Sequence, residues 1–311
     1  PAEGAVLLSG DGAGIVDAAA AELIDGTELI RYSASLDPDE VAAELDRGAS
    51  LVVTDGNRKR GERWGSLRHT RGHTERVDET QLAENLTDNR LPRFPDAGSD
   101  VQTVAIQRGG IQVDATSYGN PITFAADGRP ALAVDGDLET AWATAAFSDA
   151  RGERIVLTLD EPLDLDHLDL FQLPEVRTTR AITRVRVDVG DGRPVEVDLG
   201  ASSRLPPGQR VDLGPRTTSR IEITILADNL NEPMRYGDAG PVGFTDIGLG
   251  GSGPVLDEII RMPVDLVDAM EAADSDAARA AALTYVMTRL RQDPTDRTRE
   301  EVAELERQVV Q

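Results

Sequence analysis

The middle of the chain alternates apolar and polar residues with a period of two. Ile221, Ile223 and Ile225 are separated by single polar residues, so they share one face of an extended strand. Turns with glycine or proline separate this run from comparable runs at residues 155–159, 167–171, 184–189 and 195–199. Many short strands between turns are typical of antiparallel sandwiches and barrels. The pattern therefore predicts an antiparallel β domain over residues 101–253.

The beginning of the chain alternates two kinds of pattern instead. Residues 5–8, 28–32 and 51–54 predict strands, and residues 15–23 and 38–47 predict helices between them. Strands that alternate with helices form parallel sheets. We expect residues 1–100 to contain a small parallel α/β segment, an arginine-rich loop and a linker. A segment of this size should pack against another part of the chain.

The end of the chain has a helical period. Residues 276–291 and 298–310 repeat their apolar positions about every 3.6 residues. The sequence therefore predicts a helical tail over residues 254–311. The expected fold class is a multidomain α+β protein with three parts: the α/β segment, the β-sandwich and this tail.

The charge and composition of the chain limit the kinds of partner that it can bind. The 311 residues carry a formal net charge of −24, which repels phosphate backbones and argues against nucleic acid. There is no cysteine, which excludes thiol nucleophiles, disulfides and cysteine-based metal sites. No signal peptide and no apolar run of about 18 residues is evident. We expect the chain to be part of a longer protein.

Three features of the first hundred residues suggest binding sites, but each also has a simpler structural explanation. Gly10, Gly12 and Gly14 follow a predicted strand, but their spacing is not G-x-G-x-x-G, so we expect a glycine turn rather than a nucleotide site. His69 and His73 are four residues apart, but the H-E-x-x-H pattern of a zinc site is absent. The arginine-rich loop either binds an anion by forked contacts or pairs with the many carboxylates of the chain. We expect internal pairing. The basic residues of this loop are Arg58, Lys59, Arg60, Arg63, Arg68, Arg71 and Arg76.

Residues 133–142 form the most specific local motif. They fit the pattern x-A-x-D-G-D-x-x-T-x-W. The motif resembles a loop of discoidin and coagulation-factor C-type modules, which are jelly-roll sandwiches with a galactose-binding-like fold. In that family the loop binds a structural calcium ion and its tryptophan fills the core, so we expect Trp142 to be a core residue.

The resemblance implies a set of calcium ligands. A hard cation takes several oxygen ligands around a turn, and carboxylates, hydroxyls and backbone carbonyls can supply them. A carboxylate near the C-terminal end of the module completes the site in the family, and Asp246 occupies that place, although glutamate is commoner there. The alternative is an acidic turn without a metal, since Asp-Gly is a common turn dipeptide. The expected ligands are Leu132, Asp135, Asp137, Thr140 and Asp246.

Sugar-binding modules use loops at one end of the sandwich, with an aromatic face and fixed polar groups. Five residues near such loops are candidates for glycan contacts, and each could equally be a packing or turn residue. They are Tyr118, Asn120, Phe147, Arg154 and Tyr236. No catalytic residue can be named, because the chain has 56 acidic residues and no G-x-S-x-G motif.

Several short sequence segments, taken in their order along the chain, resemble one family more closely. They include residues 8–12, 53–58, 63–68, 72–75, 118–121, 152–154, 208–211 and 242–247. Over roughly residues 5–270 the chain is similar to the large soluble region of the actinobacterial membrane α-(1→3)-arabinofuranosyltransferases of the D type.

In that family a multi-pass membrane domain carries out the transfer, and the external part carries carbohydrate-binding modules. The resemblance implies a non-catalytic region outside the plasma membrane, tethered to the membrane catalytic domain of its parent protein. Its expected partner is a cell-wall polysaccharide, arabinan or arabinogalactan. The alternatives are a scaffold that binds no glycan and a free-standing enzyme that acts on glycans.

Overall fold

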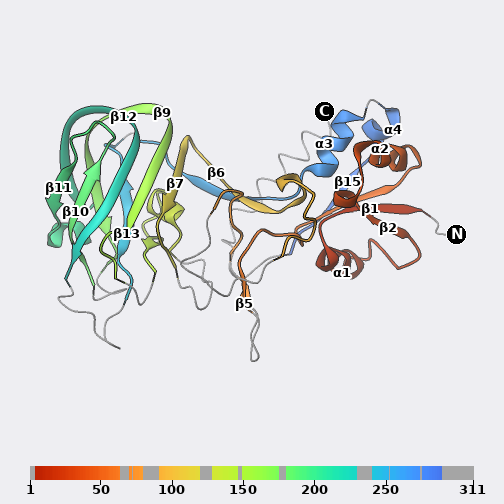
Figure 1. The fold of residues 1–311 in the computed structure, drawn as a ribbon, viewed down its shortest axis with the longest axis horizontal. Coiled ribbons are helices and arrows are strands. Elements are labelled where there is room, and N and C mark those ends of the chain that lie inside the picture. Colours follow the sequence, from red (N-terminus) through yellow and green to blue (C-terminus); the bar gives the residue numbers. More distant parts are fainter. Residues whose placement is uncertain are drawn as a thin grey trace.

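The computed structural model describes residues 4–63, 70–71, 73–79, 91–119, 128–145, 149–174, 180–229, 240–251, 253–273 and 275–288. Figure 1 shows an elongated molecule with a body of β-strands at one end and an α/β body at the other. No helix in these ranges is long and apolar enough to cross a bilayer.

The α/β body is built on a four-stranded parallel sheet in the order β15-β3-β1-β2. On β1, Leu7 faces the cluster that contains α2, whereas Val6 and Leu8 face the cluster beneath α1, as the period of two requires. The strands are β1 (Ala5–Ser9), β2 (Leu29–Tyr32), β3 (Ser50–Thr54) and β15 (Leu283–Val286). The helices are α1 (Gly12–Ala20) on one face and α2 (Pro38–Asp46), α3 (Asp265–Ala272) and α4 (Asp276–Ala280) on the other.

Local sequence determines where these helices begin. Asp37 accepts the Glu40 backbone N–H at 2.8 Å, and the Glu40 side chain accepts the Asp37 N–H at 3.1 Å, which forms a capping box at the start of α2. Asp11 caps α1 by accepting N–H groups of its first turn, at 3.0 Å from Ala13 and 3.4 Å from Gly14.

The predicted helix over residues 276–291 is wrong at residues 283–286, which form β15. The helix α4 ends at Ala280, and the chain then becomes extended and pairs with β3. Leu283 and Tyr285 pack against the α2 side of the sheet and Val286 packs on the α1 side, so these strand-forming residues bury both faces. This burial outweighs the helical period. The predicted helix at residues 298–310 lies outside the described residues.

The β body is antiparallel throughout its described ladders. The two long strands β9 and β12 pair along most of their length, with register shifts where they bend. Leu157 and Leu168, from the two halves of β9, belong to one buried cluster, so the sheet folds over a single core. The strands are β7 (Ile111–Ala115), β8 (Trp142–Ala143), β9 (Arg154–Gln172), β10 (Ile182–Asp188), β11 (Val195–Asp198), β12 (Gln209–Asp228) and β13 (Gly243–Gly248).

A two-stranded ribbon lies between the two bodies (Figure 1). Strand β6 (Val104–Arg108), which enters the sandwich, pairs antiparallel with β14 (Asp257–Arg261), which leaves it. The chain thus passes from the α/β body to the sandwich and back. A second short ribbon consists of β4 (Glu62–Arg63) and β5 (Thr70–Arg71).

Candidate functional site

The motif at residues 133–142 forms a loop that its own side chains hold together. It follows the short helix η3 (Pro130–Ala133) and precedes β8. The Thr140 hydroxyl lies 2.9 and 3.0 Å from the two Asp135 carboxylate oxygens and 2.9 Å from the Asp137 carbonyl oxygen. Asp135 also accepts the Asp137 N–H at 3.0 Å. Gly136 has φ +75°, a left-handed conformation that glycine adopts without strain.

Trp142 closes the loop onto the core, as the sequence predicted. Its side chain is fully buried and stacks on Phe244 of β13, with ring centroids 6.0 Å apart. Its indole N–H donates to the Ser117 carbonyl at 3.0 Å, so the one polar atom of the ring is satisfied. The motif tryptophan is therefore a structural residue.

Strand β13 also carries Asp246 to the loop. The pairing of β13 with β9 shifts register between Phe244 and Asp246. Because of this irregularity, Phe244 and Ile247 both face the core, and Asp246 lies half-buried between them. Burial, and then the neighbouring charges of Asp135 and Asp169, raise the pKa of Asp246 to about 6. Two carboxylates from distant parts of the chain thus lie close enough to repel one another.

These groups are oxygen donors of the kind that a hard cation prefers. Asp135 and Asp246 supply carboxylates, the Leu132 carbonyl lies 3.4 Å from the Thr140 hydroxyl, and the repulsion between the carboxylates is what a cation would relieve. The Asp137 carboxylate instead accepts the Glu139 N–H at 2.8 Å. The described residues contain no group of three or more His, Cys, Asp or Glu side chains that could hold a metal ion. Oxygen atoms of all five predicted ligands therefore gather here, with Asp135 and Asp246 contributing carboxylates and Asp137 its carbonyl.

The predicted glycan contacts have different surroundings. Arg154 is exposed at the start of β9, and its backbone pairs with Thr116. Tyr118 is only 5% exposed, so its ring does not present an open face. The other three candidates, Asn120, Phe147 and Tyr236, lie outside the described residues.

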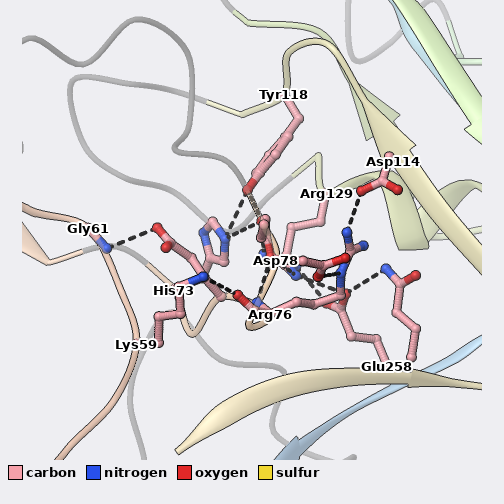
Figure 2. Close-up of polar contacts among 12 residues, drawn as sticks. Lys59, Gly61, His73, Arg76, Asp78, Asp114, Tyr118, Arg129 and Glu258 are labelled. Atoms are coloured by element: carbon pink, nitrogen blue, oxygen red, sulfur yellow. Dashed lines mark hydrogen bonds and ion pairs between the residues drawn. The ribbon is translucent and has the colours of Figure 1, made fainter. Parts of the chain in front are cut away.

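Tyr118 instead belongs to a buried polar network that the sequence did not reveal (Figure 2). Its hydroxyl contacts Glu79 and lies 3.1 Å from His73 Nε2. Arg129, with a side chain 4% exposed, donates to both oxygens of Glu258 at 2.6 and 2.8 Å and to both oxygens of Glu79 at 3.2 Å. One guanidinium thus joins two carboxylates by forked contacts.

The network joins three parts of the chain. His73 and Glu79 come from the arginine-rich loop, Tyr118 and Arg129 come from the sandwich, and Glu258 comes from β14. Burial alone would raise the pKa of Glu79, but Arg129, His73 and Tyr118 together hold that pKa well below its usual range. Because all these groups are buried, their interaction is little screened by salt, and it holds the sandwich to the ribbon and to the loop.

The arginine-rich loop pairs internally where it is described. Arg58 contacts the Asp55 carboxylate, and Arg76 contacts Asp114. The Lys59 ammonium donates to the Arg76 carbonyl at 2.6 Å. These contacts agree with the expectation of internal pairing. Trp64, Arg68 and His69 lie outside the described residues.

The sequence of the sandwich matches a known family of modules. Residues 113–255 match the family model of the third carbohydrate-binding module of arabinofuranosyltransferase D. The match covers the sandwich and less than half of the chain. No curated protein sequence matches the chain.

Solved structures show a similar fold over more of the chain. The cryo-EM structure of arabinofuranosyltransferase D from mycobacteria is similar over 75% of this chain and 17% of its own, with a TM-score of 0.50 and 19% identity. A point mutant of that protein is similar over 83% of this chain and 20% of its own, with a TM-score of 0.55 and 19% identity. This chain therefore spans about a fifth of the length of the mycobacterial protein.

Proposed function

We propose that this chain is the glycan-holding region of a cell-wall arabinofuranosyltransferase, located outside the plasma membrane. The module match over residues 113–255 carries the proposal. The sandwich, a jelly roll of the galactose-binding-like class, binds arabinan or arabinogalactan and keeps acceptor chains near a membrane catalytic domain elsewhere in the parent protein. The proposal assigns no catalytic residue to this chain.

The proposed glycan contacts are Asn120, Phe147, Arg154 and Tyr236, of which the structure describes Arg154. Arg154 is exposed, and a guanidinium can donate forked hydrogen bonds to neighbouring hydroxyls. Aromatic rings beside fixed polar groups are what a sugar site requires. We expect weak binding of a single short glycan, because sugar hydroxyls lose water as they gain contacts. Repeated contacts along a polymer would strengthen the binding.

Titration of the ¹⁵N-labelled chain with arabinan fragments, followed by amide NMR, tests this function. We expect shifts in the sandwich loops at millimolar ligand, and weaker binding by Arg154→Ala. The matched control is Arg220→Ala, which removes another exposed arginine of the same sheet. If arabinan shifts no sandwich amide, the glycan-holding function is wrong.

We also propose that the loop at residues 133–142 binds a structural calcium ion. Asp135 and Asp246 would supply carboxylates, and Leu132 and Thr140 would supply a carbonyl and a hydroxyl. Burial, and after it the charge of Asp135, raises the pKa of Asp246, and this supports the assignment because a cation between the carboxylates would offset both effects. In this position the ion would fasten β13 to the loop without contacting glycan.

A second function is favoured by the buried network. Arg129 and Glu258 fix the sandwich against the ribbon, which suits a scaffold that organises the parent enzyme and binds no glycan. The same titration separates the two functions: a chain that is only a scaffold shows no arabinan-dependent shifts.

A further inference from the structure

A cavity of about 650 Å³ opens at the carboxyl edge of the parallel sheet. Two loops line it, and each directly follows a strand. Asp11, Gly12 and Ala13 come after β1, and residues 56–60 come after β3. Leu91, Pro92 and Arg93 form part of another wall. Besides the loops of the α/β body, the lining includes Gln102, which lies just before β6 of the ribbon.

The topology of the sheet places a crevice at this point. β1 and β3 are neighbours, and the chain leaves β1 through α1 towards β2. From β3 the sheet continues in the other direction, to β15, which is preceded by helices on the opposite face. Two adjacent strands whose connections diverge leave a gap outside their carboxyl ends, and ligands of open α/β sheets bind in such gaps.

Glycine keeps the two lining loops close together. A Cβ atom on Gly56 would lie 2.4 Å from Asp11 Oδ1 and 2.8 Å from the Gly14 nitrogen. A Cβ on Gly14 would lie 2.0 Å from the Thr54 hydroxyl. Larger residues at either position would push the start of α1 away from β3. The wall of the cavity is therefore formed by closely packed backbone, as a fixed site requires.

The lining carries four basic residues and one acidic residue, and most of the basic groups already have partners. Arg58 contacts Asp55, the Lys59 ammonium donates to backbone carbonyls, and Arg93 lies 3.3 Å from the buried carboxylate of Asp11. Because these partners already engage three of the basic groups, the lining has fewer open donors for a free anion than its basic residues suggest. It does present donors and acceptors side by side, together with the apolar surface of Leu91, which is 80% exposed. Alternating hydroxyl and C–H surfaces of a neutral sugar match this combination.

We propose that this cavity is a second glycan site, distinct from the sandwich, which takes a short segment of a neutral polysaccharide. Its volume lies within the range of about 300–1,000 Å³ that is usual for ligand sites. The choice of a glycan rests on the proposed function, whereas the existence of the site rests on the cavity and the sheet topology. Two sites on opposite bodies would hold one polymer at separated points.

The test is amide NMR of the full chain with short arabinofuranosyl oligosaccharides as the probe. We expect shifts at Gly12, Ala13 and Gly56. The variant Ala13→Trp fills the cavity from an exposed position on α1 and should lose these shifts. The variant Ala20→Trp adds the same side chain at the exposed far end of the helix and should keep them. Melting temperatures show whether both variants fold. If Ala13→Trp does not fold, Arg93→Ala serves as the second test of the cavity.

The outcomes separate this site from the sandwich. Shifts confined to the sandwich loops overturn the cavity proposal and leave the proposed function standing. Shifts confined to Gly12, Ala13 and Gly56 support the cavity and contradict glycan binding by the sandwich. A parallel titration with inorganic phosphate tests the ligand class, because cavity shifts with phosphate and none with the oligosaccharide would show an anion site instead. No shift with either probe overturns the cavity site.

Discussion

Folding brings the charge of Asp246 next to that of Asp135, so removing it tests both the electrostatics and the proposed calcium site. The substitution Asp246→Asn keeps the shape of the side chain and deletes its charge. It leaves the core contacts of Phe244 and Ile247 in place, since those residues face the other side of β13. Any change in stability should therefore come from the carboxylate.

The size of the effect follows from the pKa. Burial, and then Asp135 and Asp169, raise the pKa of Asp246 from 3.8 to about 6. The folded chain then holds the proton more tightly than the unfolded chain does, so stability falls as the pH rises from about 4 to about 6 and stays reduced above that range. At about 1.4 kcal/mol per pKa unit the upper limit is about 3 kcal/mol. Partial exposure of the side chain lowers this to roughly 1–2 kcal/mol.

Urea denaturation in chelator measures this directly. Near neutral pH, Asp246→Asn should raise the free energy of unfolding by roughly 1–2 kcal/mol, and below about pH 4 the difference should vanish. In calcium the order should reverse. The wild type should gain about 2.7 kcal/mol at a hundredfold excess over its dissociation constant, and the variant should gain much less. Asp160→Asn, at an exposed position of β9, is the matched control and should change little in either buffer.

Two results would refute this reasoning separately. If Asp246→Asn is less stable than the wild type in chelator, the carboxylate is not repelled and the electrostatic argument is wrong. If calcium stabilises the variant as much as the wild type, or stabilises neither, Asp246 is not a ligand. The first result bears on the pKa and the second on the metal.

Three further substitutions test the packing. Trp142→Ala removes a fully buried ring and should cost about 3–5 kcal/mol in urea denaturation; a loss below about 1 kcal/mol would contradict its place in the core. Arg129→Met leaves two buried carboxylates without their cation and should cost about 3–5 kcal/mol, whereas Arg220→Met at an exposed pair should cost at most about 1 kcal/mol. Equal losses for the two arginines in calorimetric melting would show that the buried network contributes little. Gly56→Ala places a Cβ 2.8 Å from a backbone nitrogen of α1 and should lower stability by about 1–3 kcal/mol, while Gly200→Ala, whose nearest atom is 3.8 Å away, should be tolerated in the same melting assay.

The sequence predicted those parts of the fold that local patterns determine. The role of Trp142 followed from the motif, and the start of α2 followed from Asp37 and Pro38, because each signal acts within a few residues. The isoleucines of β12 showed their buried face directly through the period of two. In each case the side chains make the contacts that the local sequence pattern predicts.

The features that the sequence did not reveal depend on partners far along the chain. Residues 283–286 became a strand because β3, more than two hundred residues earlier, offered a free edge. The pairing of Arg129 with Glu258 joins residues 129 apart, and no spacing rule connects them. Among 56 acidic residues, the few that folding buries cannot be distinguished by composition. Tertiary context selected both the strand and the ion pairs.

The short helix η3 connects the motif loop to the buried network. Arg129 directly precedes it and joins Glu79 and Glu258, while the Leu132 carbonyl within it faces the Thr140 hydroxyl of the loop. Val134, which directly follows η3, accepts the backbone N–H of Leu256 at 2.9 Å. Leu256 lies where the chain passes from the sandwich to β14. A cation in the loop would therefore act on the same few residues that hold the sandwich to the ribbon. Under the calcium proposal, the motif would thus bear on the contact between the sandwich and the ribbon as well as on its own turn.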